Sequence, residues 1–161
     1  MSSDAEIASY RAAIGQFATG VAVVTSAGEN GPAGLTTNAL ASLSLDPLLM
    51  VVCLDRGSRT LDVVRAAGVL GVNVLAADQE PLAHKFAGKA SHAEKFSEVA
   101  WREVDGVPVL EGVVAWVAGA VDELLEGGDH LIAVTRVSSL DAPGGEPLVF
   151  HDGAYRGMGQ A

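Results

Sequence analysis

Cysteine, aromatic rings and charge are all scarce in this chain of 161 residues. Its single cysteine, Cys53, excludes an intrachain disulfide bond, and aromatic residues make up 5% of the sequence. Charged residues make up 19%, whereas an average soluble protein has roughly 25%. No apolar stretch reaches the roughly 18 uncharged residues expected of a membrane-spanning helix. The low charge indicates that part of the surface is covered, and oligomerisation is the simplest reason.

Several motifs that mark particular chemistries are also missing. No G-x-G-x-x-G follows a predicted strand, no Walker A lysine is present, and no serine or cysteine lies in a nucleophile elbow. The spacing of the histidines and the one cysteine does not form a zinc signature. The histidines are His84, His92, His130 and His151. These absences argue against a Rossmann nucleotide site, a P-loop, a hydrolase and a metal site.

The balance of charge is strongly acidic, with a formal net charge of −10. A nucleic acid or an anionic membrane requires a basic face, so both are unfavoured as partners. The first residues, MSSDAEIASYRAA, are polar and acidic, unlike a secretory signal. We therefore expect a soluble cytoplasmic protein. Local cations still gather in two places, with Arg56 close to Arg59 and with Lys85, Lys89 and Lys95 in one segment.

Short apolar segments between glycine- and proline-containing turns predict a mainly antiparallel β fold in one domain, residues 1–161. Residues 48–54 are apolar throughout, which predicts a strand buried on both faces. Helices are expected at 4–17, at 59–66 after a Ser58 cap, and at 78–86 after an Asp78 cap, with a loop or weak helix at 88–98. Strands are expected at 21–26, 34–47 including a turn at Pro47, 48–54, 69–75, 113–125, 130–140 and 148–150. Six or seven strands joined by hairpins fit a closed or half-closed antiparallel barrel better than a doubly wound sheet.

The most informative segment is GLTTNALASLSLDP, residues 34–47. It places the hydroxyl groups of Thr36, Thr37, Ser42 and Ser44 and the amide of Asn38 among small apolar residues. Such a segment is too polar for plain core and too apolar for a solvated loop. It can offer backbone N–H groups and short hydroxyls to a polyoxygenated ligand. On its own, however, the segment fits ordinary sheet, whose hydroxyls satisfy neighbouring backbone, slightly better than a ligand site.

Two other segments can carry chemistry. Residues 53–60, CLDRGSRT, run from a strand end into a helix start, where free N–H groups beside Ser58, Thr60 and two arginines suit a phosphate. The turn Gly128-Asp129 leads His130 onto a strand. The simpler alternatives are that Ser58 is only a helix cap, that His130 is structural and that Lys85 and Lys89 are a solvated face.

Taken together and in this order, these segments resemble the flavin reductase domain of the FMN-binding split-barrel superfamily. Its members include the small reductase components of two-component flavin monooxygenases. The resemblance runs from about Phe17 to Gly157. The segments that carry it are TGVAVVT at 19–25, GLTTNALASLSLDP, CLDRGSRT, VNVL at 72–75, the predicted helix around 82–87, Gly128-Asp129-His130, and PLVF at 147–150.

The resemblance implies an antiparallel split β-barrel of Greek-key type with a few short helices, associated as a homodimer. Flavin, as FMN or FAD, would lie in a groove near the dimer interface. The residues implied at the isoalloxazine and ribityl chain are Thr37, Asn38, Ala39 and Ser42, continued by Cys53 and Leu54. Those implied at the phosphate are Ser58, Arg59, Thr60, Phe86 and Lys89. His130, the implied catalytic residue, would sit beside the nicotinamide of NADH or NADPH, with Tyr155 near the same space.

The missing nucleophiles agree with this chemistry, because hydride transfer from nicotinamide to flavin needs no protein nucleophile and no strong base. The chain departs from the family pattern where Leu48 follows Pro47 and where Thr135 replaces a usual glycine. Thr135 and Arg136 are therefore candidates for setting the choice between NADH and NADPH.

The leading hypothesis is an NAD(P)H-dependent flavin reductase, an NAD(P)H:flavin oxidoreductase that supplies reduced FMN or FAD to a partner monooxygenase. One alternative is a flavin-binding carrier or electron-transfer protein on the same barrel, without nicotinamide turnover. A further alternative is a structural dimer module that has lost its cofactor.

Overall fold

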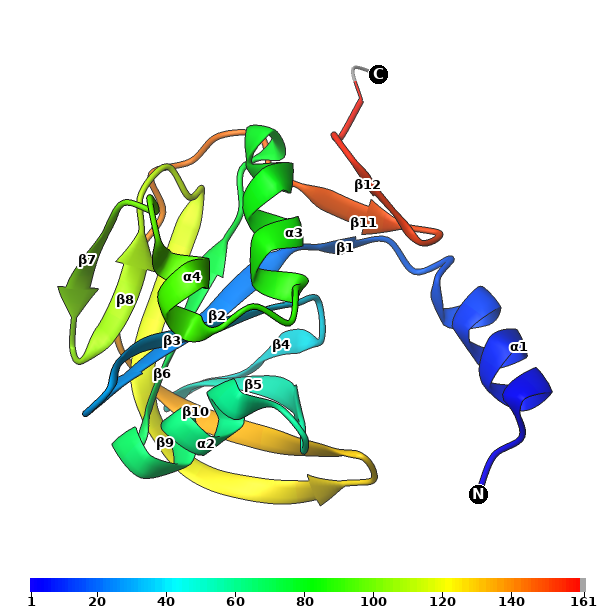
Figure 1. The fold of residues 1–161 in the computed structure, drawn as a ribbon, viewed down its shortest axis with the longest axis horizontal. Coiled ribbons are helices and arrows are strands. Elements are labelled where there is room, and N and C mark those ends of the chain that lie inside the picture. Colours follow the sequence, from blue (N-terminus) through cyan, green and yellow to red (C-terminus); the bar gives the residue numbers. More distant parts are fainter. Residues whose placement is uncertain (160–161) are drawn as a thin grey trace.

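A seven-stranded antiparallel sheet forms the body of the protein in the computed structural model, which describes residues 1–159 (Figure 1). Its strand order is β3-β2-β6-β9-β10-β5-β4. The strands in sequence order are β2 (Ala22–Gly28), β3 (Gly31–Thr37), β4 (Leu40–Leu45), β5 (Leu48–Asp55), β6 (Val69–Val74), β9 (Ala115–Gly127) and β10 (His130–Asp141). Two tight hairpins are part of this sheet, because β2 pairs with β3 around residues 28–31 and β9 pairs with β10 around residues 127–130.

The two edge strands of this sheet are neighbours in sequence. β3 ends at Thr37 and β4 begins at Leu40, yet they lie at opposite edges of the strand order. The two edges therefore converge at Asn38 and Ala39, and the backbone N–H of Cys53 in β5 donates a 2.8 Å hydrogen bond to the carbonyl of Ala39. The sheet curls into a split barrel at this point. The expectation of one strand over 34–47 was wrong, because two strands on opposite edges share that segment.

Two smaller sheets complete the β structure. β1 (Thr19–Gly20), β11 (Val149–His151) and β12 (Ala154–Arg156) form one of them. The hairpin of β7 (Trp101–Val104) and β8 (Val107–Leu110) forms the other, and the sequence analysis placed no strands there. Asn73 of β6 fastens this hairpin: its Oδ1 accepts from the N–H of Leu110 at 2.8 Å, and its Nδ2 donates to Thr25 Oγ1 at 3.1 Å.

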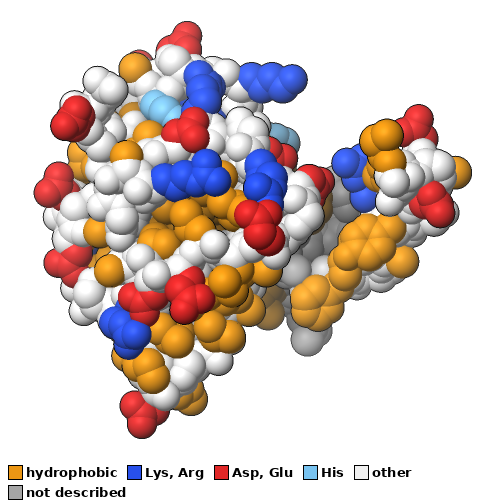
Figure 2. All heavy atoms as spheres, turned by 90° about the horizontal axis from the view of Figure 1, so that it is seen from below, with side chains coloured by type: hydrophobic (Ala, Val, Ile, Leu, Met, Phe, Trp, Pro, Cys, Tyr) orange, Lys and Arg blue, Asp and Glu red, His pale blue; other side chains and the backbone are white. Residues whose placement is uncertain are grey.

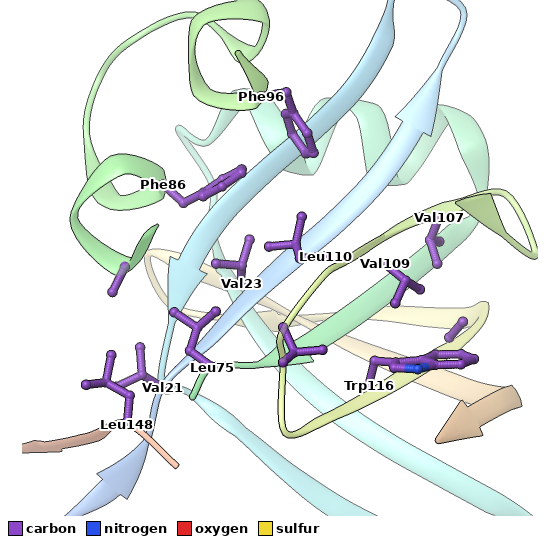
Figure 3. Packing of buried hydrophobic residues seen from close by; sticks show 13 residues of the cluster. Val21, Val23, Leu75, Phe86, Phe96, Val107, Val109, Leu110, Trp116 and Leu148 are labelled. Atoms are coloured by element: carbon purple, nitrogen blue, oxygen red, sulfur yellow. The ribbon is translucent and has the colours of Figure 1, made fainter. Parts of the chain in front are cut away.

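The core divides into two clusters on the two sides of the sheet. One lies between the sheet, β8 and two helices; there Phe86 and Phe96 meet edge to face at 5.0 Å above Val23 and Leu110 (Figure 3). The other cluster is covered by α2 (Arg59–Ala67), which contributes Leu61 and Val64. Burial of this kind stabilises by roughly 1.5–3 kcal/mol for each large apolar side chain.

The strand β5 alternates in burial rather than being buried on both faces as expected. Met50, Val52 and Leu54 are buried in the core, whereas the alternate residues Leu49, Val51 and Cys53 are half-buried. Within a single chain, only one face of β5 packs against the core. The expectation of burial on both faces was therefore wrong for the single chain.

One of the two predicted helix caps is present and the other is not. Ser58 caps α2, and Gly68 ends it in the left-handed conformation with φ of 69°. Asp78 does not cap a helix, because a short 3₁₀ helix (Ala77–Gln79) precedes α3 (Glu80–Ala87). The segment predicted as a loop or weak helix contains α4 (His92–Phe96), capped by Ser91. Within residues 1–159, we find no helix with the length and apolar character that crossing a membrane requires.

The N-terminal helix α1 (Asp4–Ile14) stands away from the body (Figure 1). It ends three residues before the predicted boundary at Phe17, and it has no buried residue. Its apolar side chains do not pack against the body of the protein. Tyr10 is 67% exposed, and Phe17, just after the helix, is 71% exposed. Figure 2 shows apolar side chains open to solvent on this protruding part.

Candidate functional site

A cavity of about 600 Å³ lies at the N-terminus of α2, and we call it the α2 groove. Five of the thirteen expected site residues line it, four of them polar or charged. They are Ser58, Arg59, Thr60, Phe86 and Lys89. The structure thus brings together residues from the start of α2 and from the end of α3 with the loop that follows it.

The start of α2 is built to receive an anion. The Ser58 side chain accepts a hydrogen bond from the N–H of Thr60 at 3.2 Å, and Asp55 Oδ1 accepts from the N–H of Gly57 at 2.6 Å. The N–H of Leu61 donates to the carbonyl of Ser58 at 3.1 Å, whereas the N–H of Arg59, the first helical residue, has no partner within the helix, and the helix dipole places positive potential there. A phosphate group fits this end of the groove.

Cationic side chains converge on the same groove. Arg59 Nη2 donates to the carbonyls of Lys89 and Ala90 at 3.0 and 2.7 Å, so it ties α2 to the loop after α3. Lys95 is only 6% exposed and donates to the carbonyl of Phe86 at 2.8 Å. Burial, aided by the nearby charge of Arg59, lowers the pKa of Lys95. These cations give the groove a local positive charge despite the acidic chain.

His92 also lines the groove, between Arg59 and Lys95. Burial lowers its pKa, and the two neighbouring cations lower it further. Both ring nitrogens are buried without a well-formed hydrogen bond among residues 1–159, and the backbone of Arg59 lies near enough to the ring to oppose part of the lowering of its pKa. The sequence analysis did not include His92 or Lys95 in the site. The signal was available as the Ser91-x-x-Glu94 capping box, which marks the start of α4.

A smaller hollow of about 150 Å³ continues the α2 groove, and the two share Thr36 and Ala87 as lining residues. We call it the Asn38 hollow; Thr37, Asn38 and Tyr155 line it, together with Val21 and Phe150. The groove and the hollow form one trough that begins at the α2 N-terminus. It ends beside Asn38 and Ala39, where the two edges of the barrel sheet converge, and we call this place the seam.

Hydrogen bonds fix the seam end of the trough. The Thr37 hydroxyl accepts from the N–H of Ala39 at 3.0 Å, and Asn38 Nδ2 donates to Thr19 Oγ1 at 3.0 Å. The Thr36 hydroxyl donates to the carbonyl of Ala83 at 2.7 Å, which joins β3 to α3. Thr37 and Asn38 are therefore held in defined positions at the edge of the Asn38 hollow. Ala39 lines a neighbouring cavity that also contains Asn38.

Three more of the residues expected at the flavin, besides Ala39, do not line the trough. Leu54 is fully buried in the core, so its side chain cannot form a wall, and this expectation was wrong for the side chain. Cys53 has the opposite orientation on β5 and is half-buried. Ser42 is exposed on β4, where it pairs with Met50. The pleat of β5 explains the difference, because successive side chains of a strand point to opposite faces.

His130 is the first residue of β10 and lies opposite Asp55 in the sheet. Its Nδ1 is 2.7 Å from Asp129 Oδ1, and the hydrogen bond between them, with the attraction of the imidazole, lowers the pKa of Asp129. Arg56 holds the turn by donating from Nε to the carbonyl of Gly128 at 2.8 Å. The ring is therefore oriented from one side by its neighbouring carboxylate.

Tyr155 lies elsewhere, on β12. Its ring meets His84 of α3 edge to face at 4.9 Å, and burial, with the charge of Glu80, raises the pKa of its hydroxyl. Within residues 1–159 of a single chain, none of the cavities described above is lined by both His130 and Tyr155. The expectation that these two residues share one space is not met within one chain.

Comparisons with known proteins agree on one family. The model of the flavin reductase like domain matches residues 14–159. An NADH-dependent flavin reductase of Rhodococcus sp is 40% identical over 151 residues, which is 92% of this chain and 84% of the relative. The HsaB reductase subunit of a flavin-dependent monooxygenase from Mycobacterium tuberculosis H37Rv is 33% identical, covering 98% of this chain and 86% of the relative.

Solved structures show the same likeness. The NADH:FAD oxidoreductase SgcE6 of Streptomyces globisporus superposes with a TM-score of 0.91 at 32% identity, covering 99% of this chain and 98% of that chain. BorF, the flavin reductase component of a bacterial two-component tryptophan halogenase, has a TM-score of 0.89 at 33% identity, covering 96% and 99%. The split barrel, the trough and a family match across residues 14–159 lead to one conclusion, that the chain belongs to the flavin reductase family.

Proposed function

We propose that this chain transfers a hydride from NADH or NADPH to a flavin and supplies the reduced flavin to a partner monooxygenase. The observation that carries the proposal is the continuous trough from the α2 N-terminus to Thr37 and Asn38. A flavin, FMN or FAD, supplies the electron-accepting ring for this chemistry. Relatives named as reductase subunits of flavin-dependent monooxygenases support a monooxygenase partner.

The residues present fit a phosphate-bearing flavin. The α2 end offers backbone N–H groups with Arg59 and Lys89, which suit an anion. Thr36 and Ala87 line the middle of the trough, where the groove and the hollow meet. The seam end offers Thr37 and Asn38 as polar groups for the ribityl chain and the edge of the ring. A ligand with a charged group at one end and a flat ring with polar edges at the other matches the order of residues along the trough.

The chain's own groups then have distinct roles in the proposal. Ser58, Arg59, Thr60 and Lys89 hold the phosphate, and Thr37, Asn38 and Ala39 face the flavin head. Cys53 and Leu54 take part only through backbone, whereas Ser42 contributes at the outer edge. His130 orients the nicotinamide and stabilises charge as the hydride moves, because preorganised dipoles act strongly in a site that excludes water. Phe86 supports the groove from the core.

We also propose a homodimer. Apolar side chains remain open on α1 and β4, including Ile14 at 52% and Leu45 at 82% exposure. Figure 2 shows apolar side chains over a broad part of one face of the body as well as on the protruding helix. A second copy is the simplest cover for both surfaces. The cytoplasmic location and the extent of the domain, residues 1–161, stay predictions, and residues 160–161 lie outside the described part.

A cross of two nucleotides with three flavins tests the function. Purified protein is mixed with NADH or NADPH and with riboflavin, FMN or FAD, and the absorbance of the nucleotide at 340 nm is followed. We expect flavin-dependent oxidation with at least one pair. Bound flavin without any nucleotide oxidation would instead favour a carrier, and no flavin binding at all would favour a structural module.

A further inference from the structure

Arg56 differs from its neighbours in the segment that leads into α2. Of residues 55–60, all except Arg56 line the α2 groove. The sequence analysis grouped Arg56 with Arg59 as cations that suit a phosphate, and the structure separates the two side chains. Arg59 stays at the groove and binds the loop after α3, whereas Arg56 binds the hairpin between β9 and β10. The position of Arg56 therefore indicates a role other than phosphate binding.

The tip of the β9–β10 hairpin projects from the body of the protein (Figure 1). Residues 125–129 are all exposed, and Gly128 adopts a left-handed φ of 73°. Packing therefore contributes little to the order of this tip, and the hydrogen bonds that reach it carry more weight. His130 is the first residue of β10 after the tip, so the position of its ring depends on how firmly the tip is held.

Arg56 contacts three residues of the tip. Its backbone N–H donates to the carbonyl of Asp129 at 3.0 Å, and its Nε donates to the carbonyl of Gly128 at 2.8 Å. Its guanidinium also forms an ion pair with Glu126, whose side chain is 80% exposed. Because an exposed ion pair contributes little, we assign the main effect of the Arg56 side chain to the bond between Nε and Gly128.

The carbonyl that Arg56 binds is directly connected to the group that orients His130. The carbonyl of Gly128 and the N–H of Asp129 belong to one planar peptide unit, so a bond to this carbonyl also restricts the backbone of Asp129. The Asp129 carboxylate in turn lies 2.7 Å from His130 Nδ1. The backbone of His130 pairs with Asp55, the residue that precedes Arg56. Residues 55 and 56 therefore hold the hairpin tip on both sides of the His130 ring's carboxylate partner.

We propose that Arg56 is a positioning residue for hydride transfer, which holds the hairpin tip so that the His130 ring stays directed at the nicotinamide. The inference rests on the proposed flavin reductase function and adds to it a residue that does not contact the flavin. A misplacement of about 1 Å in a site of this kind can slow a reaction by roughly 100-fold. Loss of the Arg56 side chain should cost less, because the backbone bond from Arg56 to Asp129 remains.

Two substitutions at position 56 separate the hydrogen bond from the charge. Arg56→Met places a methyl group where arginine has Nε, whereas Arg56→Gln places an amide N–H donor the same number of bonds from Cα. Both variants lose the positive charge and the ion pair with Glu126. The rate of flavin reduction at saturating NADH or NADPH is measured by stopped flow, and flavin affinity is measured by fluorescence titration.

We expect Arg56→Met to slow flavin reduction by roughly 5- to 10-fold, because the His130 ring is less well oriented. Its flavin dissociation constant should stay within about twofold of the wild type, because Arg56 does not line the groove. Arg56→Gln should restore the rate to within about twofold of the wild type, since the donor to Gly128 is replaced.

A double-mutant cycle shows whether Arg56 acts through His130. In a His130→Ala background, Arg56→Met should slow flavin reduction by no more than about twofold, because the ring that it positions is gone. Full activity of Arg56→Met, equal slowing in the Met and Gln variants, or an additive loss in the double variant overturns the inference. Weaker flavin binding by Arg56→Met overturns it too, whereas a wild type that reduces no flavin overturns the proposed function itself.

Discussion

The hydroxyl group of Thr25 donates a 2.6 Å hydrogen bond to the carbonyl oxygen of Pro108, which links β2 to the β7–β8 hairpin. The same hydroxyl accepts from Asn73 Nδ2 at 3.1 Å. Thr135 of β10 is equally buried, at 0% exposure, but its hydroxyl has no partner among residues 1–159. The two threonines therefore share residue type, strand context and burial, and they differ in whether the polar atom is satisfied.

We predict that replacement of these threonines by valine has opposite effects. Thr135→Val removes an unsatisfied buried hydroxyl and should raise the free energy of unfolding by about 1 kcal/mol. Thr25→Val breaks a buried hydrogen-bond pair and should lower it by about 1–2 kcal/mol. Chemical denaturation of both variants at equal protein concentration measures the difference. A loss of stability in Thr135→Val would mean that its hydroxyl has a partner in the folded protein.

Loss of the charge of Arg59 should weaken the binding of flavins that carry a phosphate and leave the binding of riboflavin unchanged. We expect Arg59→Gln to weaken FMN binding by roughly 10-fold or more, because a hydrogen bond to a charged group contributes about 1.5–3 kcal/mol. Riboflavin has no phosphate, so its affinity should stay within about twofold. Fluorescence titration with both flavins gives the comparison. Equal weakening of the two would show that Arg59 acts through the loop carbonyls of Lys89 and Ala90 rather than through the phosphate.

His130 should affect the hydride step more than flavin binding. We expect His130→Ala to slow turnover at saturating NADH by roughly 10- to 100-fold, because an orienting and charge-stabilising group is lost. The flavin dissociation constant should be unchanged. His151→Ala, at a half-buried histidine outside the trough, is the control. Stopped-flow measurement of flavin reduction separates the two steps, and full turnover in His130→Ala would exclude the proposed role.

The free energy of unfolding should depend on the protonation of His92. Its pKa is lowered in the folded protein from 6.5, chiefly by burial and further by Arg59 and Lys95. Below 6.5 the unfolded chain therefore binds more protons than the folded one, so stability falls as pH falls from 6.5 through the folded pKa. His92→Gln removes this contribution. Denaturation between about pH 5 and pH 7.5 should show a shallower acid loss in the variant than in the wild type, and parallel curves would contradict the prediction.

The exposed apolar side chains of α1 should control the association of two copies of this chain. We expect Ile14→Glu to shift the mass measured by light scattering at micromolar concentration from dimer towards monomer, because a charge replaces an apolar contact. Ala12→Glu adds the same charge on the opposite side of α1 and should leave the dimer intact. A wild type that is monomeric under these conditions would exclude the proposed homodimer.

Local signals in the sequence predicted much of the fold. Ser58 caps α2 as expected, and the glycine pair at 28 and 31 marks the β2–β3 hairpin. The β7–β8 hairpin was missed although Asp105-Gly106 between apolar residues is a strong two-residue turn signal. The anion-binding end of the site was predictable because α2, its cap and its arginines are contiguous in sequence.

Other features depend on tertiary structure. Whether Cys53 or Leu54 points inward is decided by the register of β5 with β10, and an apolar run does not reveal it. The division of residues 34–47 into β3 and β4 follows from closure of the barrel, which is a property of the whole sheet. Thr36 reads like a ligand residue in sequence, but its hydroxyl is used by the carbonyl of Ala83.

The seam at Asn38 and Ala39 also has a consequence for dynamics. The bond from the N–H of Cys53 to the carbonyl of Ala39 extends the β4–β5 ladder up to the seam, beside the Asn38 end of the trough. A ligand that binds only the folded seam opposes local opening of this ladder by RT ln(1 + [L]/Kd). The amide hydrogen of Cys53 should therefore exchange with solvent more slowly as flavin is added, so a single backbone position reports both the separation of β4 from β5 and occupancy of the site.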